Sequence, residues 1–190
     1  MTLGLKRGTV KLLPHDSEWA EIFAREKQLL KKTFGNTIIT IEHVGSTAIP
    51  GIPAKPIIDM NIGVRSLKIA RNMKNKFKKI GYEYRPVNPL ISKRQKKQLK
   101  WQELYVKGPE SKRTHFAHVT VYNSDYWRRD LLFRDYLRRN PPRAEEYANL
   151  KRKLAKKYPK NRMKYTENKD KFIQETIKIV KKRLKRKTIN

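Results

Sequence analysis

Hydrophobic residues in the first two thirds of the chain follow two spacings, which predicts strands interleaved with helices. Residues 37–44 are rich in β-branched side chains that alternate with polar ones, and residues 56–64 are almost continuously apolar. Both patterns are typical of strands, and the second is typical of a strand covered on both faces. A short apolar run at residues 10–13 predicts an edge strand, and the polar, basic residues 88–100 predict a long exposed loop. Three further strands, the last two joined as a hairpin, are expected at residues 82–87, 101–107 and 114–123.

Apolar residues at helical spacing predict five helices. The first follows Asp16 or Ser17, either of which can cap it, and it ends near Gly35, which tolerates the left-handed conformation of a helix terminus. The second begins at Ser66 and ends at Gly81. From residue 125 onward the pattern is helical throughout. The last three helices are expected at about residues 125–139, 141–158 and 162–184.

This order of elements predicts an α+β fold, because the strands are segregated from the terminal helices. We expect residues 1–124 to form a mixed sheet with helices, and residues 125–190 to form a basic helical segment that packs on it as one unit. No stretch approaches the roughly 18 consecutive apolar residues that span a bilayer, and the N-terminus lacks an apolar signal-peptide core. We therefore expect a cytoplasmic protein without a transmembrane segment.

The amino-acid composition limits the kinds of catalytic and metal site that the chain can form. The 190 residues include no cysteine, which excludes disulfides, iron–sulfur clusters, cysteine-based zinc sites and thiol nucleophiles. Lys and Arg number 47 against 17 Asp and Glu, a formal net charge of +30. A surplus of this size concerns solubility and partners rather than fold.

The basic residues are concentrated in the predicted helical segment. Residues 127–187 hold 23 Lys and Arg against 7 Asp and Glu, more than half of the total surplus in a third of the chain. Such clusters suit phosphate backbones, so RNA or another polyanion is an expected partner. The alternative is that these residues form ordinary solvated helix faces, since no RNP aromatic pair, GXXG loop or zinc finger accompanies them.

A turn after the first long strand carries the strongest chemical signal. Gly45 and Ser46 open this turn, and such turns can hold a phosphate because glycine permits close approach and the backbone amides carry partial positive charge. The hydroxyl of Thr47 can add a hydrogen bond, and Lys55, just before the next strand, can pair with the phosphate. The alternatives are an ordinary turn and a solvated loop lysine.

Acidic and amide side chains follow on the next strand. Asp59 lies within this apolar run, and Asn61 lies two residues on and faces the same side. A carboxylate in such a strand is costly unless it has a partner or a purpose. Facing a phosphate cradle, it suggests a magnesium site, because Mg²⁺ usually bridges one or two carboxylates and substrate phosphates. The alternative is a structural, hydrogen-bonded Asp59.

Histidines are the remaining candidates for proton transfer. His115 and His118 lie three apart on a predicted strand, so their side chains point to opposite faces. We predict that His118 faces Asp59, where its imidazole can contact phosphate or act as a base. His43, beside the turn, and His115 are weaker candidates. For each of them the alternative is a structural histidine with satisfied hydrogen bonds.

The glycine–serine pair followed by an aspartate resembles the signature of the nucleotidyltransferase superfamily. More closely, the chain resembles the GrpB family, also called UPF0157, because six separate motifs fall in that family's order. The matching segments are residues 14–19, 42–51, 55–59, 114–119, 133–138 and 164–169.

The resemblance implies a nucleotidyltransferase-like core that binds a nucleoside triphosphate with magnesium and transfers a nucleoside monophosphate to an unidentified acceptor. Gly45 and Ser46 match the phosphate-binding pair, and Asp59 matches the first metal-binding carboxylate. Asn61 stands where a second acid is usual, and Glu103 is the one acid in the strand that could supply a third. This departure favours two alternatives: a nucleotide- or phosphometabolite-binding module without transfer activity, and a basic RNA-binding protein.

Overall fold

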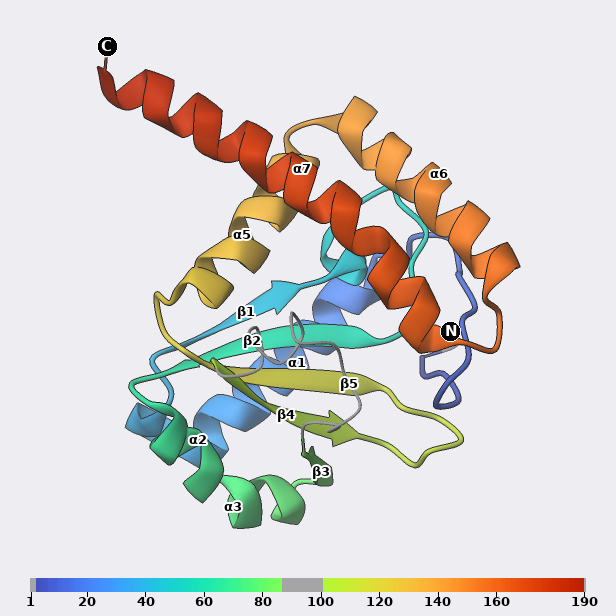
Figure 1. Cartoon of the computed structure of the whole chain (residues 1–190). Coiled ribbons are helices and arrows are strands. Elements are labelled where there is room, and N and C mark those ends of the chain that lie inside the picture. The colour runs from blue at the N-terminus through green and yellow to red at the C-terminus, as the bar shows by residue number, and fades with distance from the viewer. Residues whose placement is uncertain (1–2, 87–100, 190) are drawn as a thin grey trace.

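The computed structural model describes residues 3–86 and 101–189, with side chains through residue 184. A five-stranded mixed sheet in the order β1-β2-β5-β4-β3 forms its centre (Figure 1). β2 and β5 run parallel, and the other neighbouring strands are antiparallel. The predicted hairpin is therefore present as β4 and β5. The strands are β1 Thr40–Val44, β2 Ile58–Val64, β3 Tyr82–Arg85, β4 Gln102–Lys107 and β5 His115–Val121.

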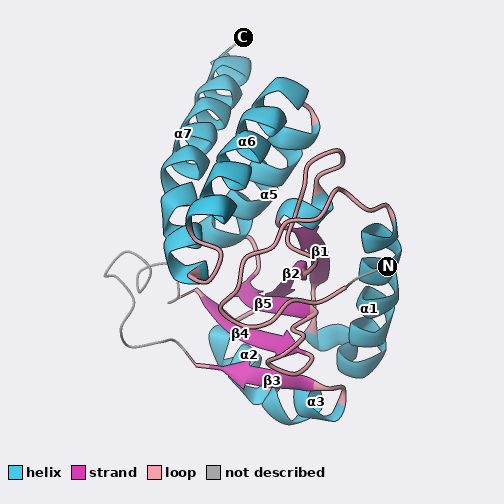
Figure 2. Cartoon of the chain, turned by 90° about the vertical axis from the view of Figure 1, so that its right-hand side faces the viewer, coloured by secondary structure: helices cyan, strands magenta, loops and turns pink. Residues whose placement is uncertain are grey.

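Helices from different parts of the chain cover the two faces of the sheet. The first three helices contact the strands from one side, and α5 contacts β1 and β5 from the other. Figure 2 shows α5, α6 and α7 lying together beside the sheet, away from α1. The predicted fold class, a mixed α+β sheet followed by a helical segment, is confirmed. The helices are α1 Glu18–Phe34, α2 Leu67–Asn72, α3 Lys74–Lys79, α5 Asp125–Arg138, α6 Pro141–Lys157 and α7 Arg162–Ile189.

Side-chain alternation along β2 separates the main core from the polar face. Ile58, Met60 and Ile62 are fully buried against α1 and α2. Asp59 and Asn61 therefore point to the other face, toward the C-terminal helices. The apolar residues that bury this strand on one side leave its polar residues available on the other.

Two predicted elements differ from the structure. The prediction of an edge strand at residues 10–13 is wrong. The backbone N–H of Val10 donates to Pro159 in the α6–α7 connection, and of these four residues only Leu13 forms a β-bridge, with Ala54. The predicted second helix is divided at Met73 into α2 and α3. The loop predicted at residues 88–100, and the last residue of the strand predicted at 82–87, lie outside the described residues.

Local capping explains where the helices begin. The carboxylate of Asp16 accepts a hydrogen bond from the Glu18 N–H at 3.0 Å, so Asp16 rather than Ser17 supplies the side-chain cap of α1. Ser66 caps α2 through the N–H of Ile69. In the described part of the chain, every helix is too short or too polar to cross a membrane.

Candidate functional site

A cavity of about 240 Å³ lies between the sheet and the C-terminal helices. We call it the Asp59 cavity. It brings together residues from the turn after β1 and from β2, β5, α5, α6 and α7, which are far apart in sequence. Six of the predicted site residues line it: Gly45, Ser46, Thr47, Lys55, Asp59 and His118.

The turn after β1 approaches Asp59 closely because residue 45 is glycine. Gly45 has a φ of +72°, a conformation that other residues rarely adopt. A Cβ atom at this position would lie 2.7 Å from Oδ2 of Asp59. The glycine is therefore required by both its conformation and its contact. It allows the turn and the carboxylate to share one wall of the cavity.

The hydroxyl of Thr47 holds the turn together. It donates to the Ile57 carbonyl at 3.3 Å, and it lies 3.0 Å from Nε2 of His43. Since the hydroxyl has a single hydrogen, Nε2 of His43 must be the donor in the second contact. His43 also stacks on Phe23, with ring centroids 4.7 Å apart. The Thr47 hydroxyl therefore contributes to the structure of the turn. Its predicted hydrogen bond to a phosphate stays a prediction.

Basic side chains of the helical segment hold the same turn from outside. Arg134 donates to the His43 carbonyl and Arg138 to the Ala48 carbonyl, at 2.8 and 2.7 Å. The side-chain nitrogen of Lys151, a fully buried residue, donates to the Pro53 carbonyl. The sequence had suggested that these residues belong to polar helix faces. The structure shows that part of the basic surplus anchors backbone carbonyls around the turn.

Asp59 and His118 face each other across β2 and β5. Nε2 of His118 lies 3.7 Å from Oδ1 of Asp59, and Nδ1 lies 2.8 Å from the side-chain oxygen of Gln102. Burial alone would raise the pKa of Asp59, but the contact with His118 and the charge of Lys55 outweigh it and hold that pKa below its usual value. Asp59 is therefore an ionised carboxylate at neutral pH.

Three cationic side chains line the same cavity. They are Lys55, Arg129 of α5 and Lys169 of α7. Burial and the nearby charges of Arg162 and Lys169 hold the pKa of Lys55 well below its usual value. Burial also lowers the pKa of Lys169 to about 8, although the charge of Asp59 opposes the change. An anion that enters between these side chains stabilises their charged forms, because it offsets the repulsion between like charges.

Asp130 of α5 lines the Asp59 cavity and contacts Asn61 of β2. Asn61 is fully buried, and its amide nitrogen donates to Oδ2 of Asp130 at 3.3 Å. The other carboxylate oxygen of Asp130 accepts from Arg129 at 3.0 Å. The amide oxygen of Asn61 is buried without a hydrogen-bond partner. A second acid therefore lines the cavity, but it is already paired and comes from a helix.

These residues do not fit a resident magnesium ion. Among residues 3–86 and 101–189, no group of three or more His, Asp or Glu side chains could hold a metal. Asp59 has cationic neighbours, Asp130 is paired with Arg129, and Asn61 turns its amide nitrogen toward Asp130. Mg²⁺ prefers several oxygen ligands in octahedral geometry. We therefore assign it no step.

Glu103 and His115 lie on the opposite face of the sheet. Glu103 accepts hydrogen bonds from Arg71 at 2.7 Å and from the hydroxyl of Tyr84 at 2.6 Å. His115 lies 4.0 Å from Glu26 of α1. Alternation along β4 and β5 turns both side chains toward the main core, so neither joins the Asp59 cavity.

Sequence reasoning missed the contribution of the helical segment to the cavity. Arg129, Asp130 and Lys169 line it together with Tyr147 and Tyr165. Their charges had been assigned to the surface, because amphipathic helices normally direct such residues to solvent. Lys169 lies in one of the matching segments, residues 164–169, and that was the available signal.

Comparisons with known proteins agree with the motifs. Residues 9–178 match the family model described as GrpB protein. The chain is 39% identical over 161 residues to the Glutamate-rich protein GrpB of Alkalihalophilus pseudofirmus, covering 83% of this chain and 87% of that protein. It is 41% identical over 150 residues to the UPF0157 protein YqkA of Bacillus subtilis, covering 79% of this chain and 41% of that protein.

A solved structure is similar over nearly the whole chain. The crystal structure of the conserved protein GrpB from Enterococcus faecalis aligns with a TM-score of 0.78 and 34% sequence identity. The alignment covers 92% of this chain and 99% of that one. Because the family model, the relatives and this structure agree, the chain belongs to the GrpB family.

Proposed function

We propose that the Asp59 cavity binds the phosphate groups of a nucleoside triphosphate or of another phosphorylated small molecule. The observation that carries this proposal is the convergence of Lys55, Arg129 and Lys169 on the Gly45–Ser46 turn. Ammonium and guanidinium groups are the usual protein partners of phosphate. Two of these cations have lowered pKa values, so a phosphate between them restores a favourable charge balance.

In the transfer of a nucleoside monophosphate, the reaction implied by the superfamily resemblance, the acceptor forms a bond to the α-phosphorus and pyrophosphate leaves. A group is also required that takes up the proton that the acceptor loses. His118 is the residue to which we assign this role. Its Nδ1 contacts Gln102, which orients the ring so that Nε2 faces Asp59. An ionised Asp59 stabilises the imidazolium that forms when Nε2 takes up a proton. In this assignment Asp59 positions and stabilises His118.

Binding is tested by thermal unfolding with each nucleoside triphosphate, with and without magnesium, in about 200 mM salt to screen surface charge. A ligand at about 100 times its dissociation constant stabilises the folded state by roughly 2.7 kcal/mol, which raises Tm by several degrees. We expect the rise to persist without magnesium, because lysines meet the phosphate charge.

Matched lysine variants locate the binding. Lys169→Met removes a cation that lines the Asp59 cavity, whereas Lys164→Met removes an exposed cation from the same helix. We expect the first variant to lose the rise in Tm and the second to keep it. No rise for any triphosphate, or equal rises in both variants, contradicts the proposal. If the rise in Tm requires magnesium, the expectation that binding is independent of the metal is wrong.

A second function is favoured by the exposed basic residues of α6 and α7. Arg152, Lys153, Lys171 and Lys178 are all exposed, so the outer surface of the helical segment remains strongly basic. We propose that this surface binds RNA or another polyanion through its phosphate backbone. This binding does not use the Asp59 cavity and can be separated from it by its salt dependence.

A further inference from the structure

A second cavity, of about 440 Å³, lies on the same face of the sheet as the Asp59 cavity. Its volume is in the range of sites that hold small molecules. Phe116, which lines it, is the residue of β5 directly opposite Asp59 in the β2–β5 pair. Four arginines contribute to its wall, and we call it the arginine cavity: Arg7, Arg85, Arg113 and Arg162.

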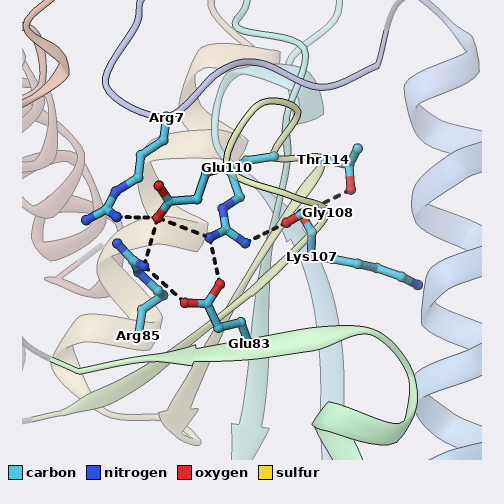
Figure 3. Close-up of polar contacts among 8 residues, drawn as sticks. Arg7, Glu83, Arg85, Lys107, Gly108, Glu110 and Thr114 are labelled. Carbon is cyan, nitrogen blue, oxygen red and sulfur yellow. Dashed lines mark hydrogen bonds and ion pairs between the residues drawn. The ribbon is translucent and has the colours of Figure 1, made fainter.

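Three of the arginines share two glutamates, as Figure 3 shows for Arg7, Arg85, Glu83 and Glu110. Arg85 contacts Glu83 at 3.1 Å and Glu110 at 3.5 Å, and Arg113 contacts Glu83 at 2.6 Å. Arg7 also pairs with Glu110. Within the described chain, Arg7 and Arg85 make these contacts only through Nη1. Each guanidinium carries further N–H donors besides the one used in these contacts.

Arg162 adds a cation that no carboxylate neutralises directly. Its guanidinium lies 4.3 Å above the ring of Phe116, and it forms no ion pair with any residue of the ranges 3–86 and 101–184. It is also close enough to Asp59 to influence the pKa of that carboxyl. Four arginines therefore face two glutamates, and Arg162, whose charge interacts with that of Asp59, lies at the boundary between the two cavities.

The remaining surface of the arginine cavity is apolar. Leu104 and Val106 of β4 and Phe116 of β5 form its floor, because alternate residues of these neighbouring strands share one face. Met163 of α7 lies at its rim with 51% of its surface exposed. An apolar floor with arginines at one side matches a molecule that is acidic at one end and apolar at the other.

We propose that the arginine cavity binds a small acid with an aromatic or apolar body. The carboxylate or phosphate group contacts the arginines, and the body lies on the floor formed by Leu104, Val106 and Phe116. This site is independent of what occupies the Asp59 cavity. Because the cavity lies next to Asp59, it would also hold the acceptor of the transfer reaction. That role rests on the proposed function.

The site is tested by isothermal titration calorimetry with phenyl phosphate, benzoate and inorganic phosphate, in about 200 mM salt. We expect phenyl phosphate and benzoate to bind at least about tenfold more tightly than inorganic phosphate, because each adds an apolar ring. Equal affinity for inorganic phosphate and phenyl phosphate contradicts a site that uses the apolar floor.

A matched pair of glutamate variants tests whether the acid binds in the arginine cavity. Met163→Glu and Ile179→Glu each add one negative charge at an exposed apolar position of α7, but only Met163 lines the arginine cavity. We expect Met163→Glu to weaken phenyl phosphate binding at least about tenfold, since a charge at the rim repels the acid. Ile179→Glu should bind like the unmodified protein. Equal affinities in the two variants overturn the proposal.

Lys169→Met distinguishes the two cavities. We expect it to leave phenyl phosphate affinity unchanged, while Met163→Glu leaves the nucleoside triphosphate rise in Tm unchanged. If Lys169→Met abolishes phenyl phosphate binding and Met163→Glu does not, the acid binds in the Asp59 cavity and the proposal is wrong. Failure of the triphosphate experiment alone overturns the proposed function and leaves the arginine cavity intact.

Discussion

Single residues in this protein determine how closely the turn at Gly45 approaches Asp59. Gly45 and Gly51 both have positive φ values, +72° and +79°. They differ in their surroundings, because a Cβ at Gly45 meets Asp59 whereas a Cβ at Gly51 meets no atom within 4 Å. The pair therefore compares a positive-φ glycine that contacts Asp59 with one that faces open space.

We expect Gly51→Ala to destabilise the protein by about 1 kcal/mol, the usual conformational cost. Gly45→Ala should cost about 3 kcal/mol, because a steric clash with the Asp59 carboxylate is added. Urea unfolding of both variants measures the difference. Equal losses of stability would show that the turn and Asp59 are not in the contact described.

Buried histidines predict how stability depends on pH. Burial lowers the pKa of both His43 and His115 to about 4, against about 6.5 in the unfolded chain. As pH falls below about 6.5 the unfolded chain takes up protons that the folded protein excludes, so stability decreases until about pH 4. The free energy of unfolding should rise with pH across this window, by about 1 kcal/mol per pH unit for each histidine.

Urea unfolding at about pH 4.5, 5.5 and 6.5 measures how the free energy of unfolding changes with pH. His43→Asn should have a smaller slope than the unmodified protein because one of the two titrating groups is removed. An unchanged slope in that variant would contradict the pKa assigned to His43.

At the scale of single elements, strand alternation separates structural acids from site residues. Glu103 of β4 accepts hydrogen bonds from Arg71 and Tyr84 on the α2 side of the sheet. Asp59 of β2 faces the other side. Two acids that the sequence grouped as possible metal ligands therefore lie on opposite faces.

Glu103→Gln should lower stability by about 1–3 kcal/mol, because a buried charged acceptor of two hydrogen bonds is lost. It should leave the nucleoside triphosphate rise in Tm unchanged. Asp59→Asn should instead change ligand binding, since its charge balances Lys55 and Lys169. A loss of ligand binding in Glu103→Gln would contradict the placement of the site.

At the scale of the whole molecule, basic residues occupy two different environments, the interior and the exposed surface. Lys151 and Lys169 are turned inward, whereas Arg152, Lys153 and Lys178 are exposed. A net charge of +30 therefore overstates what the surface alone presents. The division also allows the two proposed functions to be tested separately.

Polyanion binding should weaken steeply between about 50 and 200 mM salt, as expected for backbone contacts, whereas triphosphate binding in the buried cavity should weaken less. Asp59→Ala should abolish nucleotidyl transfer and leave RNA binding unchanged, because it does not alter the exposed helices. Filter binding to a single-stranded RNA across this salt range, with both proteins, measures the effect. Full transfer activity in Asp59→Ala would show that the assigned site is wrong.

Local sequence patterns determined much of this protein. The alternation of apolar and polar residues predicted the strands that contribute to the site, and it placed Asp59 and Asn61 on one face and His115 and His118 on opposite faces. The Gly45 turn was also evident from sequence. These features depend on backbone geometry within one element, where residue spacing alone sets side-chain direction. The roles assigned to these residues remain predictions.

Only the tertiary structure decided which distant residues meet. Lys169 lies 110 positions after Asp59 in the chain, yet both line one cavity because α7 packs over the face of the sheet that Asp59 occupies. The structure also engaged Thr47 with His43 and Ile57, and it turned Lys151 inward to Pro53. Such contacts depend on how separate elements pack together, and residue spacing within one element does not specify that packing.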